Sequence, residues 1–302
     1  MIRGLVSIII PFYNKHETIR RATDSILSQS YSNWELFIID DCSDITLDLE
    51  SFQMDHRIKV FNNQQNIGAA LTRQRGMELS NGEFVTFLDA DDWWGNDFLV
   101  LCITAMEKDK DSDGAYVKSL IYETDGSTLI RKYSDLGLTK IRETLIQYSR
   151  PWQTGGILWR KSSCGDWGLL KTNEDSWFEI SSAKYNKLIA INSIAYFIDQ
   201  VGDNHLSRQY SSCMVSKDNI EVFHKIRAEQ YGKLALNTKI VLFNRLIRCH
   251  LKIMENCDNR SIVYSISRLK EISFLYCLIV HSKLLIKGLH MILQNTPFRV
   301  YT

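Results

Sequence analysis

The sequence predicts an α/β fold with a mostly parallel sheet, helices on both faces of the sheet, and a helical C-terminal appendage. Over the first 95 residues, apolar strands alternate with amphipathic helices through short loops. Polar residues cluster directly after successive strands, where ligands bind in open α/β sheets. Beyond residue 216 the apolar pattern is mainly helical.

Apolar runs and the turn residues between them locate the expected elements. β-Branched and aromatic runs predict strands at 5–10 (ended by Pro11), 34–39, 58–61, 84–88, 114–122, 127–133, 155–160 and 189–197. Apolar residues at helical spacing predict helices at 16–30, 46–54, 69–79, 98–108, 139–149 and 173–186. The β-α-β-α-β-α-β order of the first half is typical of a parallel sheet with right-handed crossovers.

Length and charge suggest one large domain, 1–215, and a helical region, 216–302. The 302 residues are 45% hydrophobic, and the formal charge of +1 gives no sign of nucleic-acid binding. However, residues 216–302 hold 14 Lys and Arg against 6 Asp and Glu, so this region carries +8 and the first 215 residues carry −7. An acidic front and a basic tail suggest a metal-using site followed by a surface that faces an anionic partner.

The cysteines and the apolar segments bear on the cellular location. Seven scattered cysteines without a Cys-x-x-Cys pair predict a reduced, cytoplasmic chain that has no disulfides and no zinc site. We expect no secretory signal, because the first apolar run is only about six residues long. The apolar segment 272–293 contains charges that would each cost about 2.5–3.5 kcal/mol at the centre of a membrane span. Two interpretations stay open: a basic helix on the inner face of an anionic membrane, or a helical lid on the domain.

Three carboxylates within four residues follow the strand expected at 84–88. They belong to Asp89, Asp91 and Asp92. Crowded carboxylates repel one another unless a cation lies between them, and oxygen ligands of this kind suit Mg²⁺ or Mn²⁺. A solvated acidic turn explains the same residues taken alone. The decision depends on whether other segments supply partners for a metal-bound phosphate.

Five segments, taken together and in order, strongly resemble the family 2 glycosyltransferases. They are SIIIPFYN at 7–14, SILSQS at 25–30, ELFIIDDCS at 35–43, NIGAALTR at 66–73 and GEFVTFLDADD at 82–92. The resemblance implies a GT-A fold, which is Rossmann-like, with a nucleotide-binding half at 1–95 and an acceptor half at 96–215. It also implies an inverting, metal-dependent transfer of a hexosyl or N-acetylhexosaminyl group from a nucleotide-diphosphate sugar. The implied donor is UDP-linked, and the implied acceptor is a lipid-linked or surface oligosaccharide of a capsule, O-antigen or lipooligosaccharide.

The resemblance also assigns residues to the nucleotide and the metal. Asp41 would accept a hydrogen bond from the base while Tyr13 offers its ring face. The full set expected at the nucleotide is Pro11, Tyr13, Asn14, Glu17, Asp41, Asn66, Arg73 and Asp89. Asp91 matches the metal ligand, with Asp89 beside it, and His205 lies in a segment similar to the loop that closes over the diphosphate. Simpler roles are loop packing for Tyr13, helix capping for Asp40, Asp41 and Glu17, a solvated helix face for Arg73, and a structural role for His205.

Inverting transfer further requires a base that takes the proton of the acceptor hydroxyl. The resemblance places it at Asp175, with Glu174 second, and the alternative is that both only complement a helix N-terminus. Four tryptophans could stack on sugar rings or lie in the core: Trp152, Trp159, Trp167 and Trp177. The same choice applies to Trp93 and Trp94, of which at least one is expected in the core. A non-catalytic nucleotide-sugar or glycan-binding protein is the rival function, whereas an oxidoreductase would need a Gly-x-Gly-x-x-Gly motif after the first strand.

Overall fold

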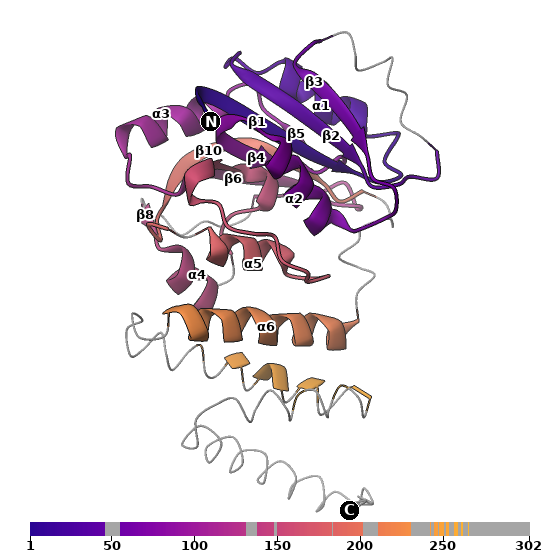
Figure 1. Ribbon diagram of the computed structural model, residues 1–302, viewed down its shortest axis with the longest axis vertical. Helices are drawn as coiled ribbons and strands as arrows, with labels where there is room; N and C mark the ends of the chain where they lie inside the picture. Colours follow the sequence, from indigo (N-terminus) through magenta and orange to yellow (C-terminus); the bar gives the residue numbers. More distant parts are fainter. Residues whose placement is uncertain are drawn as a thin grey trace, which may run out of the picture. The chain divides into compact units, whose positions relative to one another are not determined.

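The computed structural model describes residues 1–45, 55–130, 138–147, 150–182, 184–201 and 211–230, and single positions between 242 and 265. The chain forms two compact units, Met1–Gln209 and Tyr210–Thr302. The first unit contains one large sheet with helices packed on it, and the second begins with a long helix (Figure 1). The two domains proposed from the sequence, with their boundary at residue 215, stay a prediction.

In the described residues of the first unit, the sheet has ten strands and is accompanied by five α-helices. Figure 1 labels most of these elements. The strands are β1 (Ile2–Phe12), β2 (Trp34–Asp40), β3 (Ile58–Asn62), β4 (Gly82–Phe87), β5 (Trp93–Trp94), β6 (Gly114–Tyr122), β7 (Thr128–Ile130), β8 (Leu138–Thr139), β9 (Ile157–Arg160) and β10 (Leu188–Asp199). The helices are α1 (Ile19–Leu27), α2 (Ala69–Leu79), α3 (Phe98–Lys108), α4 (Ile141–Gln147) and α5 (Glu174–Ser181).

The strand order is β3-β2-β1-β4-β9-β6-β10-β5, with β7 beside β6 and β8 beside β10. The first four strands of this order are parallel to one another. The short strand β9 then pairs antiparallel with both β4 and β6, and β6 and β10 are again parallel. Because β9 joins the two parallel parts in one sheet, both parts can bring their loops to the same site.

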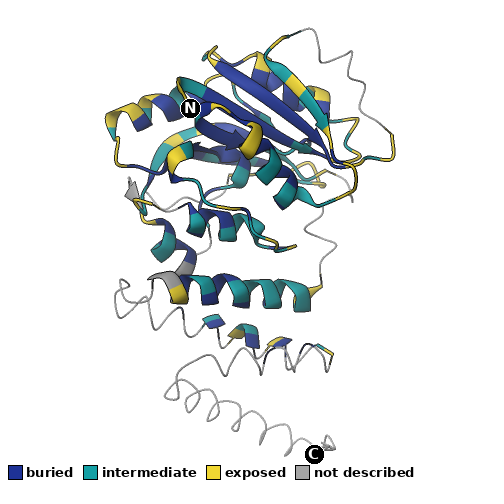
Figure 2. Ribbon diagram, in the orientation of Figure 1, coloured by how far each residue is buried: buried dark blue, intermediate teal, exposed yellow. Residues whose placement is uncertain are grey.

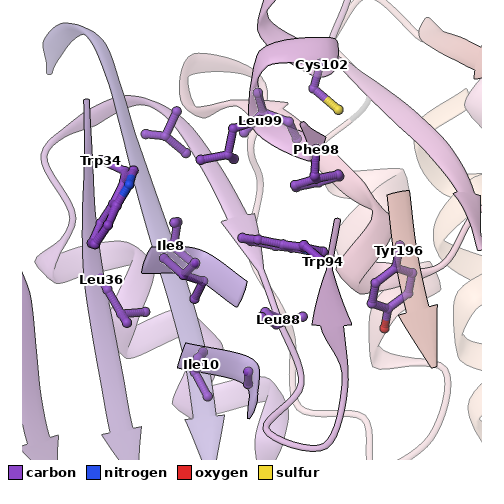
Figure 3. Close-up of a cluster of buried hydrophobic side chains, with 14 of the residues drawn as sticks. Ile8, Ile10, Trp34, Leu36, Leu88, Trp94, Phe98, Leu99, Cys102 and Tyr196 are labelled. Atoms are coloured by element: carbon purple, nitrogen blue, oxygen red, sulfur yellow. The ribbon is translucent and has the colours of Figure 1, made fainter. Parts of the chain in front are cut away.

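Helices cover both faces of the sheet, as predicted. On one face, Ile8 and Ile10 of β1 join a core cluster that contains Ile26 of α1 and Phe98 of α3 (Figure 3). On the other face, α2 lies so close to β1 that a Cβ atom at Gly76 would be 2.5 Å from Cγ2 of Ile9. Alternate residues of a strand point to opposite faces of the sheet. Because every residue of β2 is buried, this strand is covered on both faces (Figure 2).

The prediction that Pro11 ends the first strand is wrong. β1 continues to Phe12, and Pro11 pairs with Ile39 of β2. Along this stretch Ile9 faces β4, since its carbonyl accepts from the Leu88 N–H at 3.0 Å, and Phe12 faces β2. Pro11 faces the β4 side as Ile9 does, but the β4 register ends at Ile9. The missing proline N–H therefore costs the sheet no ladder hydrogen bond.

Several other predicted bounds differ from the structure. α1 and α5 are shorter than the predicted helices at 16–30 and 173–186, and the strand expected at 155–160 begins only at Ile157, after a 3₁₀ turn. The two-residue strands β5 and β8 were not expected. The predicted helix at 46–54 lies outside the described residues.

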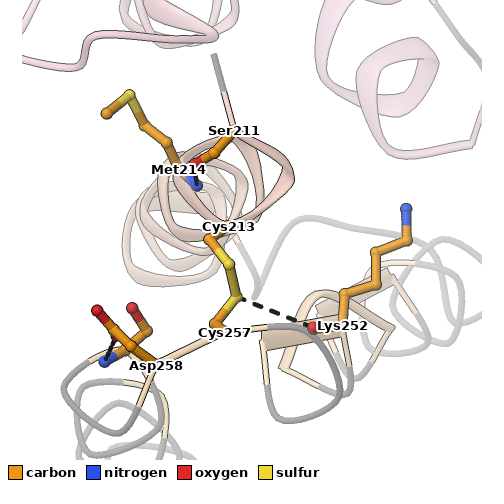
Figure 4. The surroundings of a disulfide bond; sticks show 7 residues. Ser211, Cys213, Met214, Lys252, Cys257 and Asp258 are labelled. Carbon is orange, nitrogen blue, oxygen red and sulfur yellow. Dashed lines mark hydrogen bonds between the residues drawn. A yellow bond between two sulfur atoms is a disulfide. The ribbon is translucent and has the colours of Figure 1, made fainter.

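The second unit begins with α6 (Ser212–Gln230). A disulfide joins Cys213 of this helix to Cys257, with a Cα–Cα distance of 5.8 Å (Figure 4). The prediction of a chain without disulfides is therefore wrong at this pair, whose separation of 44 residues matches no short cysteine motif. Among the described cysteines, Cys42, Cys102, Cys164 and Cys249 are free thiols.

Within the part of the chain that the structure describes, no helix has both the length and the hydropathy needed to cross a bilayer. The segment 272–293 lies outside that part, so both interpretations of it stay predictions.

Candidate active site

The loops after β1 and β2 are tied together by Asn14. Its side chain donates to Asp44 Oδ2 (2.8 Å) and accepts from the Asp44 N–H (2.9 Å), and its own N–H donates to Ser43 Oγ (2.9 Å). Asn14 has a φ of 51°, a left-handed conformation that asparagine adopts more readily than most residues. The neighbouring Tyr13 is 41% exposed, so its ring is accessible at this edge of the sheet.

Asp41 fixes the loop that leads into α2. This buried carboxylate accepts three hydrogen bonds, from Asn63 Nδ2 (2.7 Å), the Ile67 N–H (2.9 Å) and the Gly68 N–H (2.8 Å). Gly68 is the N-cap of α2, so Asp41 does bind a helix start, as the simpler interpretation holds. An ionised carboxylate offers about four acceptor positions, which leaves one for a ligand such as a base N–H.

The remaining residues predicted at the nucleotide occupy the same side of the sheet. Pro11 is half-buried at the end of β1, and Asn66 is exposed in the loop between β3 and α2. Glu17 is exposed in the turn before α1, not in the first turn of the helix as expected. Asp40 holds its own turn, because its Oδ1 accepts from the N–H (2.9 Å) and the hydroxyl (2.7 Å) of Ser43.

Arg73 of α2 connects the nucleotide side of the sheet to the downstream half of the unit. Its guanidinium lies 2.6 Å from Asp89 Oδ1 and 3.6 Å from Glu174 Oε1, above the ring of Trp167. Burial acts to lower the pKa of Arg73, but the charges of Asp89 and Glu174 outweigh it and hold the pKa above its ordinary value. The interpretation of Arg73 as part of a solvated helix face is therefore wrong.

The carboxylates of Asp91 and Asp92 have different surroundings. Asp91 lies 3.0 Å from Lys15 Nζ, and its carbonyl accepts from Arg21 at 2.6 Å. Asp92 is buried and accepts from the hydroxyl of Tyr196 and from the Asp199 N–H (3.1 Å). Burial, together with the nearby charges of Asp89 and Asp91, raises the pKa of Asp92 well above its usual range. Asp92 thus anchors the acidic loop, residues 89–92, to β10.

Asp89 and Asp91 have the chemistry of a divalent-cation site. Their carboxylates are 36% and 21% exposed, and each ion pair described above uses one carboxylate oxygen. The described residues contain no group of three or more His, Cys, Asp and Glu arranged to hold a metal, and His205 lies outside them. Mg²⁺ commonly binds one or two protein carboxylates together with substrate phosphates and water. The residues present therefore fit an ion that binds together with a diphosphate.

The two candidate bases are neighbours at the start of α5. Asn173, in a left-handed conformation with a φ of 56°, precedes the helix. Glu174 extends to Arg73, whereas Asp175 forms an ion pair with Arg150 and accepts from the Ser176 N–H at 2.7 Å. Both are partly exposed at this point, with side-chain exposures of 23% and 24%. Asp175 thus lies next to Glu174 in the chain, and Glu174 and Asp89 are both ion-pair partners of the Arg73 guanidinium.

Of the two roles left open for the four tryptophans, the structure assigns three of them to the core. Trp152, Trp159 and Trp167 are fully buried, so their faces cannot stack on a ligand. Trp177 is partly exposed and donates its indole N–H to Asp166 at 2.9 Å. Trp94 is buried among the apolar side chains of the core (Figure 3), which confirms that at least one of the Trp93-Trp94 pair is in the core. Its indole N–H donates to the Gly155 carbonyl at 2.7 Å.

Sequence reasoning missed the partners of the predicted residues. Lys15, Arg21, Arg150 and Tyr196 each contact a predicted carboxylate or its loop. Arg21 and Asp199, for example, are 178 positions apart in the chain, yet their side chains lie 2.7 Å apart. No spacing rule connects such positions. For Lys15 and Arg21, the only signal in the sequence is a basic residue close to the end of β1 or the start of α1.

The family to which the chain belongs follows from a sequence comparison. The model of the family described as "Glycosyl transferase family 2" matches residues 7–163, slightly more than half of the chain. This range includes all four loops at the carboxyl edge of β1 to β4. The chain therefore belongs to glycosyl transferase family 2.

Named bacterial relatives share one stretch of the sequence. TuaG of Bacillus subtilis (strain 168), named for teichuronic acid biosynthesis, is 44% identical over 100 residues, which are 32% of this chain and 40% of TuaG. WfgD of Escherichia coli, a UDP-Glc:α-D-GlcNAc-diphosphoundecaprenol β-1,3-glucosyltransferase, is 40% identical over 105 residues, which are 34% of this chain and 42% of WfgD. Each match spans less than half of the relative.

The fold is similar to that of TarS from S. aureus. Its structure with UDP-GlcNAc, residues 1–349, matches with a TM-score of 0.65 and 19% identity, over 88% of this chain and 80% of that chain. Its structure with UDP matches with a TM-score of 0.62 and 17% identity, over 87% of this chain and 78% of that chain. The similarity confirms the predicted GT-A fold.

We expect Tyr196→Phe to lower the free energy of unfolding by about 1–3 kcal/mol, because the buried Asp92 carboxyl loses a hydrogen-bond partner while the packed ring is retained. Urea unfolding followed by tryptophan fluorescence measures the change. Tyr185→Phe is the matched control, since the Tyr185 ring is 41% exposed and its backbone N–H makes the contact with Asp113. Equal stability of the two variants would contradict the anchoring role of Asp92.

Proposed function

We propose that this protein is an inverting, metal-dependent glycosyltransferase that moves a hexosyl or N-acetylhexosaminyl group from a UDP-sugar to an oligosaccharide hydroxyl. One observation carries the proposal: Arg73 joins Asp89, in the acidic loop, to Glu174, the neighbour of the candidate base Asp175. A donor diphosphate at the acidic loop and an acceptor at the start of α5 would therefore lie on either side of the buried Arg73 guanidinium.

The comparisons support the choice of donor and acceptor. TarS, whose fold is similar, has been crystallised with UDP-GlcNAc and with UDP. WfgD takes UDP-Glc and a GlcNAc-diphosphoundecaprenol acceptor by its name, and TuaG is named for the synthesis of a surface polymer. By analogy, the acceptor of this chain is a lipid-linked or surface oligosaccharide of the capsule, O-antigen or lipooligosaccharide type.

In this proposal the uracil binds between Tyr13 and the remaining acceptor position of Asp41. The diphosphate lies near Lys15 and Arg73, which are cations already held at the acidic loop. A Mn²⁺ or Mg²⁺ ion at Asp89 and Asp91, with His205 as a further candidate, would neutralise charge that develops on the leaving diphosphate. Asp175 takes the proton of the acceptor hydroxyl as that oxygen attacks the anomeric carbon.

The metal and the donor can be tested together. UDP-, GDP- and dTDP-sugars are screened for nucleotide release, and we expect Mn²⁺-dependent release from a UDP-sugar that EDTA abolishes. Asp91→Asn should reduce the rate roughly 100-fold or more, because the ion that would neutralise the leaving diphosphate loses one of its carboxylate ligands. Calorimetry of UDP binding with and without Mn²⁺ gives a readout that does not depend on turnover. A rate that is unchanged by EDTA would contradict the metal assignment.

The base is tested by Asp175→Asn with an oligosaccharide acceptor. We expect transfer to fall by about 10²–10⁴-fold while UDP affinity is retained, since the carboxylate acts only on the acceptor proton. Asp125→Asn, at the tip of the β6–β7 hairpin, is the matched control. Full transfer by Asp175→Asn would refute the base, and UDP-sugar binding without any transfer by the wild type would favour a non-catalytic binding protein.

Membrane association at the inner leaflet is proposed from the +8 charge of residues 216–302. We test this association by co-sedimentation of the full chain with vesicles that contain roughly 30% phosphatidylserine, which imitate an anionic leaflet. Neutral phosphatidylcholine vesicles are the comparison. Binding should be stronger to the anionic vesicles and should weaken at high salt. Equal binding to both would argue against an electrostatic anchor.

A further inference from the structure

A second carboxylate lies one helical turn behind Asp175, and the proposed reaction makes no use of it. Glu179 is four residues further along α5, so the two side chains lie on the same face of the helix. The Glu179 side chain is only 2% exposed, compared with 24% for Asp175. It is therefore too deep to touch an acceptor, although it belongs to the same row of side chains.

Arg150 lies between these two carboxylates. One terminal nitrogen of its guanidinium pairs with Asp175 Oδ2, and Nε lies 3.1 Å from Glu179 Oε1. The other terminal nitrogen donates to Thr154 Oγ1 at 3.2 Å. The planar guanidinium thus has a neighbour at each of its three nitrogens, and Asp175 is the more exposed of its two carboxylate partners.

Stability alone does not account for this arrangement. Burial raises the pKa of Glu179 to about 7 against the opposing effects of Arg150 and Trp152, which shows that the buried charge is unfavourable. Buried ion pairs can often be replaced by apolar residues without loss of stability. A buried glutamate behind a candidate base therefore calls for a role in the site.

We propose that Arg150 and Glu179 are positioning residues that orient the Asp175 carboxylate and set its strength as a base; the inference rests on the proposed role of Asp175. Arg150 holds Oδ2 of Asp175, and the Ser176 N–H donates to Oδ1 at 2.7 Å, so the two contacts together fix the direction of the carboxylate. This is the arrangement of a base oriented by a third group, extended by one residue.

Glu179 also balances the charge of Arg150. If Asp175 faced the arginine alone, the cation would stabilise the ionised carboxylate and weaken it as a proton acceptor. An ionised Glu179 shares that cation, so the three groups together carry one negative charge and Asp175 stays basic. When Glu179 binds a proton, the full charge of Arg150 acts on Asp175 and makes its carboxylate a weaker proton acceptor.

The other charged groups near α5 have partners of their own. Glu174 of the same helix contacts Arg73, and Glu143 of α4, which packs against α5, accepts from Asn186 Nδ2 at 2.7 Å. Arg142 of α4 acts on Asp113. In the described part of the chain, Arg150 is thus the cation that faces Glu179.

The test measures kcat, donor and acceptor KM and the pH profile of the full chain with the UDP-sugar found in the donor screen. We expect Glu179→Gln to lower kcat about 10-fold, which is less than the loss of the base itself would cost, with donor KM changed less than about 2-fold. Protonation of Glu179 weakens the base, so wild-type activity should fall as the pH drops through about 7. In Glu179→Gln this acid limb should move to lower pH, because the group that titrates is gone.

Arg150→Lys is the second variant, because an ammonium group cannot hold both carboxylates as a planar fork does. It should also lower kcat with little change in donor KM, and its effect should be non-additive with Glu179→Gln because both act through one group. Glu143→Gln is the matched control on the neighbouring helix and should keep the wild-type kcat and pH profile.

The outcomes separate this inference from the proposed function. If Asp175→Asn abolishes transfer but folded Glu179→Gln and Arg150→Lys keep the wild-type kcat and acid limb, the positioning role is wrong and the base stands. If Asp175→Asn keeps transfer, the base assignment fails and this inference fails with it. If Glu179→Gln does not fold, as judged by circular dichroism, the kcat and acid limb of Arg150→Lys decide.

Discussion

A buried guanidinium, that of Arg73, is the contact on which the geometry of the site depends. It has an acidic partner on each side, Asp89 from the loop after β4 and Glu174 from the start of α5. An arginine that is withdrawn from water must be paired, and loss of one partner of such a pair typically costs about 3–5 kcal/mol. The loop after β4 and the start of α5 are consequently joined through one buried side chain. The carboxylate of Glu174 therefore has little freedom to move.

The acidic loop follows the same logic of charge balance. Each of its carboxylates has a separate partner: Arg73 for Asp89, Lys15 for Asp91 and Tyr196 for Asp92. The loop can thus keep its shape without a bound ion, while two cations already lie at the point where a diphosphate would add negative charge. Burial separates Asp92 from the other two, because burial and the nearby charges raise its pKa well above the usual range, and a carboxyl that ionises less readily is a poorer metal ligand.

How much could be predicted from the sequence depended on whether the relevant contacts were local. The bounds of α2 (Ala69–Leu79), α3 (Phe98–Lys108) and β6 (Gly114–Tyr122) agree with the prediction, because apolar periodicity and flanking turns define such elements within a short window. β5 has only two residues and depends on pairing with β10, so no local pattern indicates it. The Cys213–Cys257 disulfide escaped prediction for the same reason.

The candidate site divides in the same way. Sequence motifs indicated the loops and the carboxylates. The partners of those carboxylates could not be predicted, because they are distant in the chain. Arg150 is the clearest case: its sequence neighbours gave no reason to connect it with α5, whereas the structure places it between Asp175 and Glu179. The sequence left open whether four tryptophans stack on sugar rings or lie in the core, and three of them are core, since aromatic residues serve both purposes and only burial separates them.

The start of α5 directs two neighbouring carboxylates to different partners. Successive residues of an α-helix point about 100° apart, so neighbouring carboxylates cannot face the same partner. Glu174 therefore extends to Arg73 and the acidic loop, while Asp175 extends to Arg150. The left-handed Asn173 sets where the helix begins, and with it which carboxylate takes which direction. A start shifted by one residue would turn both side chains by about 100°, so the pairing of Glu174 with Arg73 and of Asp175 with Arg150 depends on where the helix begins after Asn173.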